Sequence, residues 1–487
     1  MIRQQYHSCP AYRVNCFFWS VGTERGEVAM ELNDIFGILE DVPDYRVFLT
    51  VDELKTSNHE LSNRYPDNVE ILPIGCSRQN DPIEAIKIGD GPKKALLFAM
   101  PHPNEPIGSM MLEYLSFRLA EDDGLREALG YTWYLVKCID PDGTRLNEGW
   151  FKGPFSIRNY ASHFYRPSDI QQVEWTFPID YKTLHFHDPL PETQALMALI
   201  GQMQPDFICP LHNCGFGGTY FYISEEATAL YDPLYKLVDS QDLPLHQGEP
   251  EAPFIPKYAD AIFEDSPIAD AYDYLEEQTG ADPAEVIKWG TNSTDYAMRF
   301  SNPFSLICEV PYFYSPAIQD TSPSDILRRD AILQGVGQAE DDIGFLKRQY
   351  DVVKSELTVS SPFRDAIEEY LKIIPQRLVA EKNQAQTDPE FAERATVAQK
   401  FDSLVIGKFY RLLLLGMFIR MLDAQINVSG DSPSLSSAQE AANVTFEAHI
   451  TDFMTDLDYT VIPIQKLVRV QLGSALLAAS YATGRLL

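Results

Sequence analysis

The chain has 487 residues, of which 45% are hydrophobic and 23% charged, as in ordinary globular proteins. Its length is typical of about two to three domains. The 39 basic and 71 acidic residues give a net charge of −32, which disfavours non-specific binding to nucleic acids and to anionic membranes. The composition also excludes a largely disordered chain.

Cysteine and targeting signals are mostly negative. The seven cysteines form no CxxC pair, which disfavours a cysteine-ligated zinc ribbon and predicts reduced cysteines in a cytoplasmic protein. Residues 1–15 lack the apolar core of a signal peptide. The most apolar stretch, residues 404–422, contains Lys408, Arg411 and Arg420, so it predicts a buried helix rather than a membrane span.

Strand-like and helical patterns alternate through most of the chain. We expect residues 1–60 to pack on a larger domain at 61–323. Near-continuous apolar runs are typical of strands buried on both faces of an α/β sheet. The clearest runs are residues 95–100, 131–139, 206–211 and 304–308, with helical patterns at 106–119 and 192–203. The expected fold class is therefore α/β, with a mixed sheet flanked by helices.

From about residue 324 to 487 the pattern is almost entirely helical. A serine-rich loop at 429–437 can cap the helix that follows it. The expected helices are 326–353, 362–383, 388–426 and 436–456. We therefore predict a C-terminal all-α domain, which would either support a lid or form a contact between copies of the chain.

Chemically reactive side chains follow all four apolar runs. His102 and Glu105 follow the first run, Asp140 the second, His212 and Asn213 the third, and Glu309 the fourth. In α/β sheets, ligands bind beyond the carboxyl ends of the strands. Two histidines and a glutamate form a ligand set of catalytic zinc, which keeps one position open. His-x-x-Glu is common by chance, however, and a loop histidine with a first-turn helix acid is the alternative.

Four ordered segments between residues 61 and 311 resemble the zinc carboxypeptidases of the carboxypeptidase A type. They are LSNRYP through HPNEP, DPDG at 140–143, the helix and strand before His212, and FSLICEVP at 304–311. The chain resembles a divergent bacterial member with a helical extension. The resemblance implies a phosphorylase/hydrolase-like fold and one zinc ion held by His102, Glu105 and His212. It implies that Glu309 is the general base, which moves a proton from zinc-bound water to the leaving amine.

The arginines of that family are matched less closely. The family uses one arginine to polarise the scissile carbonyl and an Asn-Arg pair to hold the terminal carboxylate, since a guanidinium can form two hydrogen bonds with a carboxylate. Its Asp-x-Asn-Arg-Asn block is absent here. Arg145 and Arg158 compete for the carbonyl role, and Tyr165-Arg166 is the expected substitute for the pair. His163 lies where the family has an aspartate that orients the first zinc histidine.

Residues 290–300 resemble the segment that forms the family's specificity pocket. The pocket base then falls at Ser293 or Thr294, beside Asp295. Because neither base residue is charged, we expect a neutral substrate side chain. Asn213, next to the last ligand, completes the expected substrate-binding residues.

The sequence therefore predicts a zinc metallocarboxypeptidase that removes a C-terminal residue from a peptide or peptide-like metabolite. One alternative is a deacylase of N-acyl amino acids, similar to aspartoacylase, and another is a non-catalytic scaffold stabilised by zinc. The expected partner is a peptide or small amide with a free carboxylate, and no nucleic acid or membrane. A second histidine pair, His185 and His187, is expected in a solvated loop.

Overall fold

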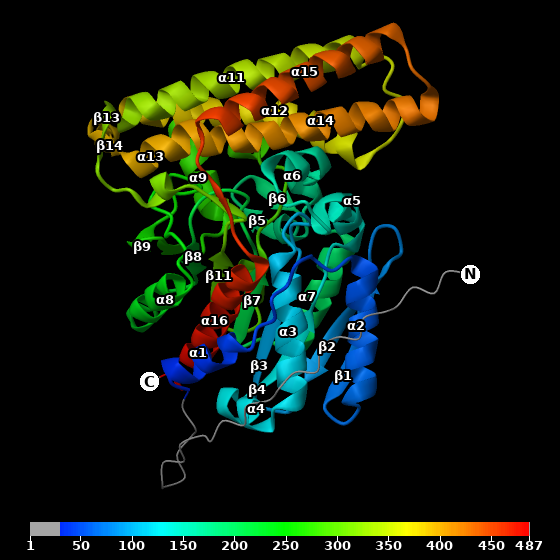
Figure 1. The fold of residues 1–487 in the computed structure, drawn as a ribbon, viewed down its shortest axis with the longest axis vertical. Coiled ribbons are helices and arrows are strands. Elements are labelled where there is room, and N and C mark those ends of the chain that lie inside the picture. Colours follow the sequence, from blue (N-terminus) through cyan, green and yellow to red (C-terminus); the bar gives the residue numbers. More distant parts are fainter. Residues whose placement is uncertain (1–29, 487) are drawn as a thin grey trace.

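A nine-stranded mixed sheet forms the centre of the computed structural model, which describes residues 30–486 (Figure 1). In spatial order its strands are β1 (Val69–Cys76), β2 (Pro82–Ile88), β4 (Tyr131–Val136), β3 (Lys93–Ala99), β7 (Phe207–Leu211), β11 (Phe304–Glu309), β8 (Tyr220–Ile223), β10 (Ile262–Glu264) and β9 (Lys257–Ala259). The four strands predicted from apolar runs are β3, β4, β7 and β11, side by side at the middle of the sheet. The expected mixed α/β fold is confirmed.

The central strands run in one direction. β3 pairs in parallel with both β4 and β7, and β7 pairs in parallel with β11. β8 then pairs with β11 in the opposite direction, which makes the sheet mixed. The carboxyl ends of β3, β7 and β11 therefore meet at one edge, where the sequence places its reactive side chains.

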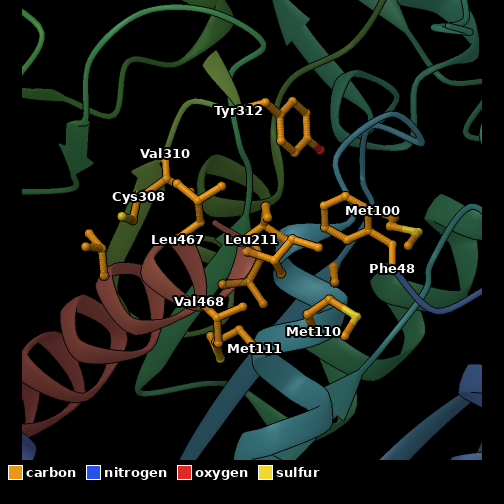
Figure 2. Packing of buried hydrophobic residues seen from close by; sticks show 14 of the residues in the cluster. Phe48, Met100, Met110, Met111, Leu211, Cys308, Val310, Tyr312, Leu467 and Val468 are labelled. Carbon is orange, nitrogen blue, oxygen red and sulfur yellow. The ribbon is translucent and has the colours of Figure 1, made fainter. Parts of the chain in front are cut away.

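Helices bury both faces of the sheet, and this explains the unbroken apolar strands. Along β3, Leu97 and Ala99 belong to one core while Leu96 and Phe98 belong to another. The first core is covered by α3 (Ile107–Glu121), α8 (Thr228–Ser240) and α16 (Ile464–Ala482), and the second by α7 (Pro191–Met203). Figure 2 shows the first core, with the side chains of α3 and α16 packed together beneath the end of β11.

The N-terminal part of the described chain packs on this domain. α1 (Leu32–Glu40) contacts α16, and α2 (Val51–Arg64) contacts α3 and β1. Residues 1–29, which include most of the expected N-terminal segment, lie outside the described residues. Over residues 30–486, every helix falls short of the length and apolar character needed to cross a membrane.

Four long helices form a bundle above the carboxyl edge of the sheet (Figure 1). They are α11 (Arg328–Val353), α12 (Pro362–Thr387), α14 (Gly407–Ser429) and α15 (Pro433–Asp456). The helix expected over 388–426 is interrupted at its start by η5 (Pro389–Ala392), β14 (Arg394–Thr396), α13 (Val397–Phe401) and a π-helical turn, η6 (Asp402–Ile406). α16 lies outside the bundle and packs against the sheet and its helices. The helical region expected at 324–487 therefore has two parts, the bundle and α16.

Shorter elements connect these layers. They are α4 (Asp123–Leu129), α5 (Pro141–Phe151), α6 (Ile157–His163), η1 (Asp169–Gln171), η2 (Val173–Trp175), β5 (Ile179–Tyr181), β6 (Leu184–Phe186), α9 (Ile268–Thr279), η3 (Pro283–Glu285), α10 (Ser293–Ala297), β12 (Phe313–Tyr314), η4 (Pro316–Gln319), β13 (Pro323–Leu327) and β15 (Thr460–Val461). β13 pairs with β14, and β12 with β15. These two small pairings join residues near the end of the catalytic region to the helical part of the chain.

The bundle contacts the catalytic region closely at α14. A Cβ atom on Gly416 would lie 2.1 Å from the carbonyl oxygen of Ala161 in α6. No side chain fits at that distance, so glycine allows the two helices to touch through their backbones.

We predict that Gly416→Ala destabilises the protein, because α14 must move away from α6 and the contact cannot relax by a rotamer change. Gly337→Ala is the matched control, since Gly337 is also inside a long helix but has no atom within 4 Å of an added Cβ. Alanine there should be neutral or stabilising by up to about 1 kcal/mol. Urea unfolding of the two variants measures both effects, and equal stabilities would contradict this account of the contact.

Candidate metal centre

A strained turn directs the first two candidate ligands away from β3. Met100, just beyond that strand, has a φ of +57°, a conformation that costs a non-glycine residue about 1 to 3 kcal/mol. The chain then turns tightly, with the Glu105 N–H donating to the His102 carbonyl at 3.1 Å. His102 and Glu105 therefore share one side of a short loop before α3 begins.

The third candidate ligand, His212, is brought to this loop by contacts between α3 and β7. The Asn213 side-chain oxygen accepts from the Ile107 N–H at 3.2 Å, which helps to satisfy the start of α3. Gly108 allows the close approach, since a Cβ there would lie 2.5 Å from the Leu211 Cβ. The beginning of α3 and the end of β7 are thus held against each other.

His102, Glu105 and His212 form a compact, buried group that could hold a metal ion. Their ligand atoms lie within 4.8 Å of one another, and each residue is at most 5% exposed. The His212 Nδ1 is 3.1 Å from Glu105 Oε2, whereas the buried His102 Nδ1 has no hydrogen-bond partner. Two nitrogens and a carboxylate oxygen are a donor set that suits zinc. The residues present therefore fit a zinc ion.

The two histidines have opposite electrostatic environments. Burial, together with the charge of Arg166, holds the pKa of His102 well below its usual value. Burial also opposes charge on His212, but the Glu105 carboxylate outweighs it and raises the pKa of His212. The Gln172 side chain lies near His102 and opposes this lowering of its pKa, and the His102 ring stacks on Trp175 with ring centroids 6.2 Å apart. These neighbours fix the orientation of the first ligand.

Arg166 compensates the charge of the buried Glu105 carboxylate. Its Nη1 donates to Glu105 Oε1 at 2.8 Å, and its Nε donates to the Gln172 side-chain oxygen at 3.1 Å. The guanidinium is partly exposed, and none of the hydrogen bonds found over residues 30–486 uses its Nη2. One edge of the guanidinium is thus available to a ligand.

The helical bundle holds the backbone segment that carries Arg166. From α14, Arg420 donates to the carbonyl oxygens of His163 and Phe164 at 2.6 and 3.0 Å. From α12, the Tyr370 hydroxyl donates to the Pro167 carbonyl oxygen at 2.9 Å. Two helices of the bundle therefore fix the backbone on both sides of this arginine.

Glu309, the last residue of β11, is buried, and its Oε2 has no hydrogen-bond partner. Burial and the neighbouring carboxylates of Glu105 and Glu251 raise the pKa of Glu309 well above its usual value, while Arg166 opposes the rise. Both ends of the Glu105–Arg166 ion pair thus act on Glu309. The structure brings Glu309 to the metal-binding group, as the strand order predicts.

Three of the expected site residues have other partners in the structure. Arg145 forms ion pairs with Asp52 and Asp81 at 2.7 and 2.9 Å on the surface, so it is not free to polarise a substrate carbonyl. Arg158 pairs instead with Glu447 of α15. Tyr165 is buried beside Phe363, with ring centroids 5.2 Å apart, so Arg166 faces the site without it.

Most of the other expected site residues have structural partners. Ser293 binds Glu174, and the Thr294 hydroxyl is 3.0 Å from the Ser305 hydroxyl. The Asp295 N–H donates to the Asn292 side-chain oxygen at 2.8 Å, which caps the start of α10. These positions therefore belong to a polar network around the start of α10.

His163 does not take the place of the family's orienting aspartate. Its Nδ1 lies 3.0 Å from the Asn159 carbonyl oxygen, within its own helix. Gln172 lies near His102 and accepts from Arg166, and with Glu174 and Glu251 it is a residue of the site that the sequence analysis did not identify. Gln172 and Glu174 lie in a mostly polar stretch, residues 168–174, and this stretch was the sequence feature that could have indicated them.

Residues 55–237 match the zinc carboxypeptidase family. This segment is similar to the zinc carboxypeptidases. It includes His102, Glu105 and His212, which would hold the zinc ion that the family requires. Glu309 lies beyond the matched residues.

Individual relatives are distant. Zinc carboxypeptidase A 1 of Anopheles gambiae is 29% identical over 140 residues, which are 25% of this chain and 32% of that protein. The chain thus spans about a third of the length of this curated relative. Among solved structures, carboxypeptidase A of Helicoverpa armigera is 14% identical, with 56% of this chain and 66% of that chain covered and a TM-score of 0.34. A Burkholderia cenocepacia metallo-carboxypeptidase is 16% identical, with coverages of 54% and 60% and a TM-score of 0.30.

We predict that His102→Ala and His212→Ala each lose most of the bound zinc, because two remaining ligands hold the ion poorly. The unmodified protein should carry about one zinc ion per chain. His187→Ala is the matched control, since this histidine is exposed and pairs with Asp180 on the surface. Elemental analysis after dialysis measures the zinc content. Full occupancy in either ligand variant would show that the ligand set is wrong.

Proposed function

We propose that the chain is a zinc-dependent carboxypeptidase, which removes a C-terminal residue from a peptide or a peptide-like metabolite. The match of residues 55–237 to the zinc carboxypeptidase family supports metal-dependent hydrolysis. The observation that carries the proposal is the pairing of a three-ligand group with a separate, buried and unpartnered carboxylate, Glu309. A site that only stabilised the fold through zinc would not need this second acid.

Glu309 is suited to accept and return a proton. Its Oε2 makes no hydrogen bond in the protein, and burying an unpaired carboxyl group is costly unless it has a task. When bound, zinc would lower the pKa of a water ligand to about 7 and polarise the scissile carbonyl. Glu309 then takes a proton from the attacking water as the new C–O bond forms. It gives that proton to the amine as the C–N bond breaks.

Arg166 is suited to hold the substrate beside Glu309. Its contacts to Glu105 and Gln172 fix the guanidinium plane, and the remaining Nη2 can donate to a carboxylate or carbonyl oxygen. Arg145 and Arg158 pair with acidic residues elsewhere, which supports our assignment of Arg166 to the substrate. Its role in holding the terminal carboxylate is part of the proposal.

We predict that Glu309→Gln keeps its zinc but lowers kcat by about 10² to 10⁴-fold, because glutamine has the same shape and cannot carry the proton. Glu277→Gln, an exposed change on α9, is the control for a general effect of lost charge. Zinc content and peptide hydrolysis are measured on the same samples. Near-normal turnover by the zinc-loaded Glu309 variant would show that another group is the general base, and would contradict the proposal.

Arg166→Lys is predicted to weaken recognition of the terminal carboxylate while leaving a positive charge beside Glu105. The kcat/KM for a peptide acid should fall at least about tenfold more than that for its C-terminal amide, because lysine lacks the planar pair of donors. Arg145→Lys should leave both values unchanged, since Arg145 lies in a surface ion-pair cluster. Equal losses on acid and amide would assign the carboxylate to a different group.

A further inference from the structure

One face of β11 leads from Glu309 back to a second group of polar residues. Alternate side chains of a strand share a face, so Ser305, Ile307 and Glu309 point to the same side. The four-residue step from Ser305 to Glu309 spans about 13 Å of strand. Ile307, between them, is partly exposed, so this face is not completely covered by other elements.

Apolar side chains line the middle of this face. Tyr222 of β8 pairs across from Ile307, and Phe263 of β10 packs beside Tyr222, with ring centroids 5.9 Å apart. These residues form one hydrophobic cluster with Tyr220, which pairs across from Glu309. An aliphatic chain extending from Glu309 towards Ser305 would therefore meet apolar walls.

Two carboxylates lie at the Ser305 end. Asp265, which is half-buried, accepts from the Ser305 hydroxyl at 3.1 Å and from the Asn292 amide at 3.2 Å. Glu174, only 2% exposed, accepts from the Ser293 N–H and hydroxyl through Oε1 at 3.0 and 2.8 Å. Its buried Oε2 has no hydrogen-bond partner.

No basic side chain of residues 30–486 forms an ion pair with either carboxylate. The charged neighbours that shift the pKa of Glu174 are His212 and Asp265. Those that shift the pKa of Asp265 are His212 and Asp295. Burial raises the pKa of Glu174 to about 7, although His212 and the hydrogen bonds from Ser293 oppose the rise. A buried carboxylate with an unused oxygen is costly in isolation, and a ligand with a positive charge would compensate it.

We propose that the substrate's terminal residue carries a long cationic side chain, whose apolar stem lies along Ile307 and whose ammonium group binds Asp265 and Glu174. This inference rests on the proposed function and names its substrate class. It departs from the neutral side chain expected from Ser293 and Thr294. Ser293 and Thr294 are uncharged, but two carboxylates from other elements lie beside them. Asp265 directly follows β10, and Glu174 belongs to η2.

The test compares two N-acetylated tripeptides that differ only in a C-terminal lysine or norleucine. Norleucine keeps the unbranched stem and lacks the ammonium group. We expect a kcat/KM at least 100-fold higher for the lysine peptide, because without the ammonium group the carboxylates stay uncompensated. Equal or faster hydrolysis of the norleucine peptide would overturn the inference.

Binding separates this inference from the proposed function. Calorimetric titration of zinc-loaded Glu309→Gln should show the lysine peptide binding at least tenfold more tightly than the norleucine peptide. If wild-type protein hydrolyses neither peptide but this preference is present, the proposed activity fails and the cation site stands. Equal binding of the two peptides overturns the cation site, whatever the turnover.

Substitutions locate the recognition. Asp265→Asn and Glu174→Gln should each lower the lysine-to-norleucine ratio of kcat/KM at least tenfold. Asp188→Asn, an exposed change outside this group, should keep the wild-type ratio. Far-ultraviolet circular dichroism and melting confirm folding. If a variant fails to fold, the wild-type ratio and the binding preference still decide the proposal. A folded Asp265 variant with the wild-type ratio would remove that residue from the site.

Discussion

The buried carboxylate of Glu105 requires compensation, and much of the site's architecture meets that requirement. It is 3% exposed, and a charge in such a place is destabilising unless other groups pair with both of its oxygens. Arg166 pairs with one oxygen, while the His212 ring and the Asn213 N–H approach the other. The loop after β3, the end of β7 and the Arg166 segment must therefore meet at one point. This set of donor atoms suits zinc, and a zinc ion bound there would add positive charge beside Glu105.

This requirement makes the helical region a part of the site. Arg166 reaches Glu105 because Arg420 and Tyr370 of the bundle hold the backbone around it. α16 contributes from the opposite side, since the buried Gln471 amide donates to the His212 carbonyl oxygen at 2.6 Å and to that of Cys308 at 3.4 Å. One side chain thus connects the ends of β7 and β11. Residues far beyond the matched segment, 55–237, fix the positions of the groups that the segment supplies.

Features that depend on local sequence were predictable, and features that depend on distant neighbours were not. The apolar runs of β3, β4, β7 and β11 identify the central strands because both faces of the sheet are buried. The ligands follow those strands directly, so their positions could be read from the sequence. Arg145 and Arg158 could not be assigned, because their surface partners lie 64 or more residues away in the chain.

The charge of the proposed pocket shows the same limit. Residues 290–300 contain no carboxylate at the expected pocket base, which favours a neutral substrate. The tertiary structure adds Asp265 and Glu174 from other segments, through hydrogen bonds to Ser305 and Ser293. The sequence pattern also could not distinguish the π-helical turn at Asp402–Ile406 from the α-helix expected over 388–426. A pocket's chemistry is set by every element that reaches it, and a single segment indicates only part of it.

The most direct test of the central claim follows a pool of peptides with varied C-terminal residues by mass spectrometry. The zinc-loaded protein should release single C-terminal residues. A chelator should stop the release, and added zinc should restore it. An intact pool in the presence of fully zinc-loaded protein, or cleavage that continues after the metal has been removed, would contradict the account.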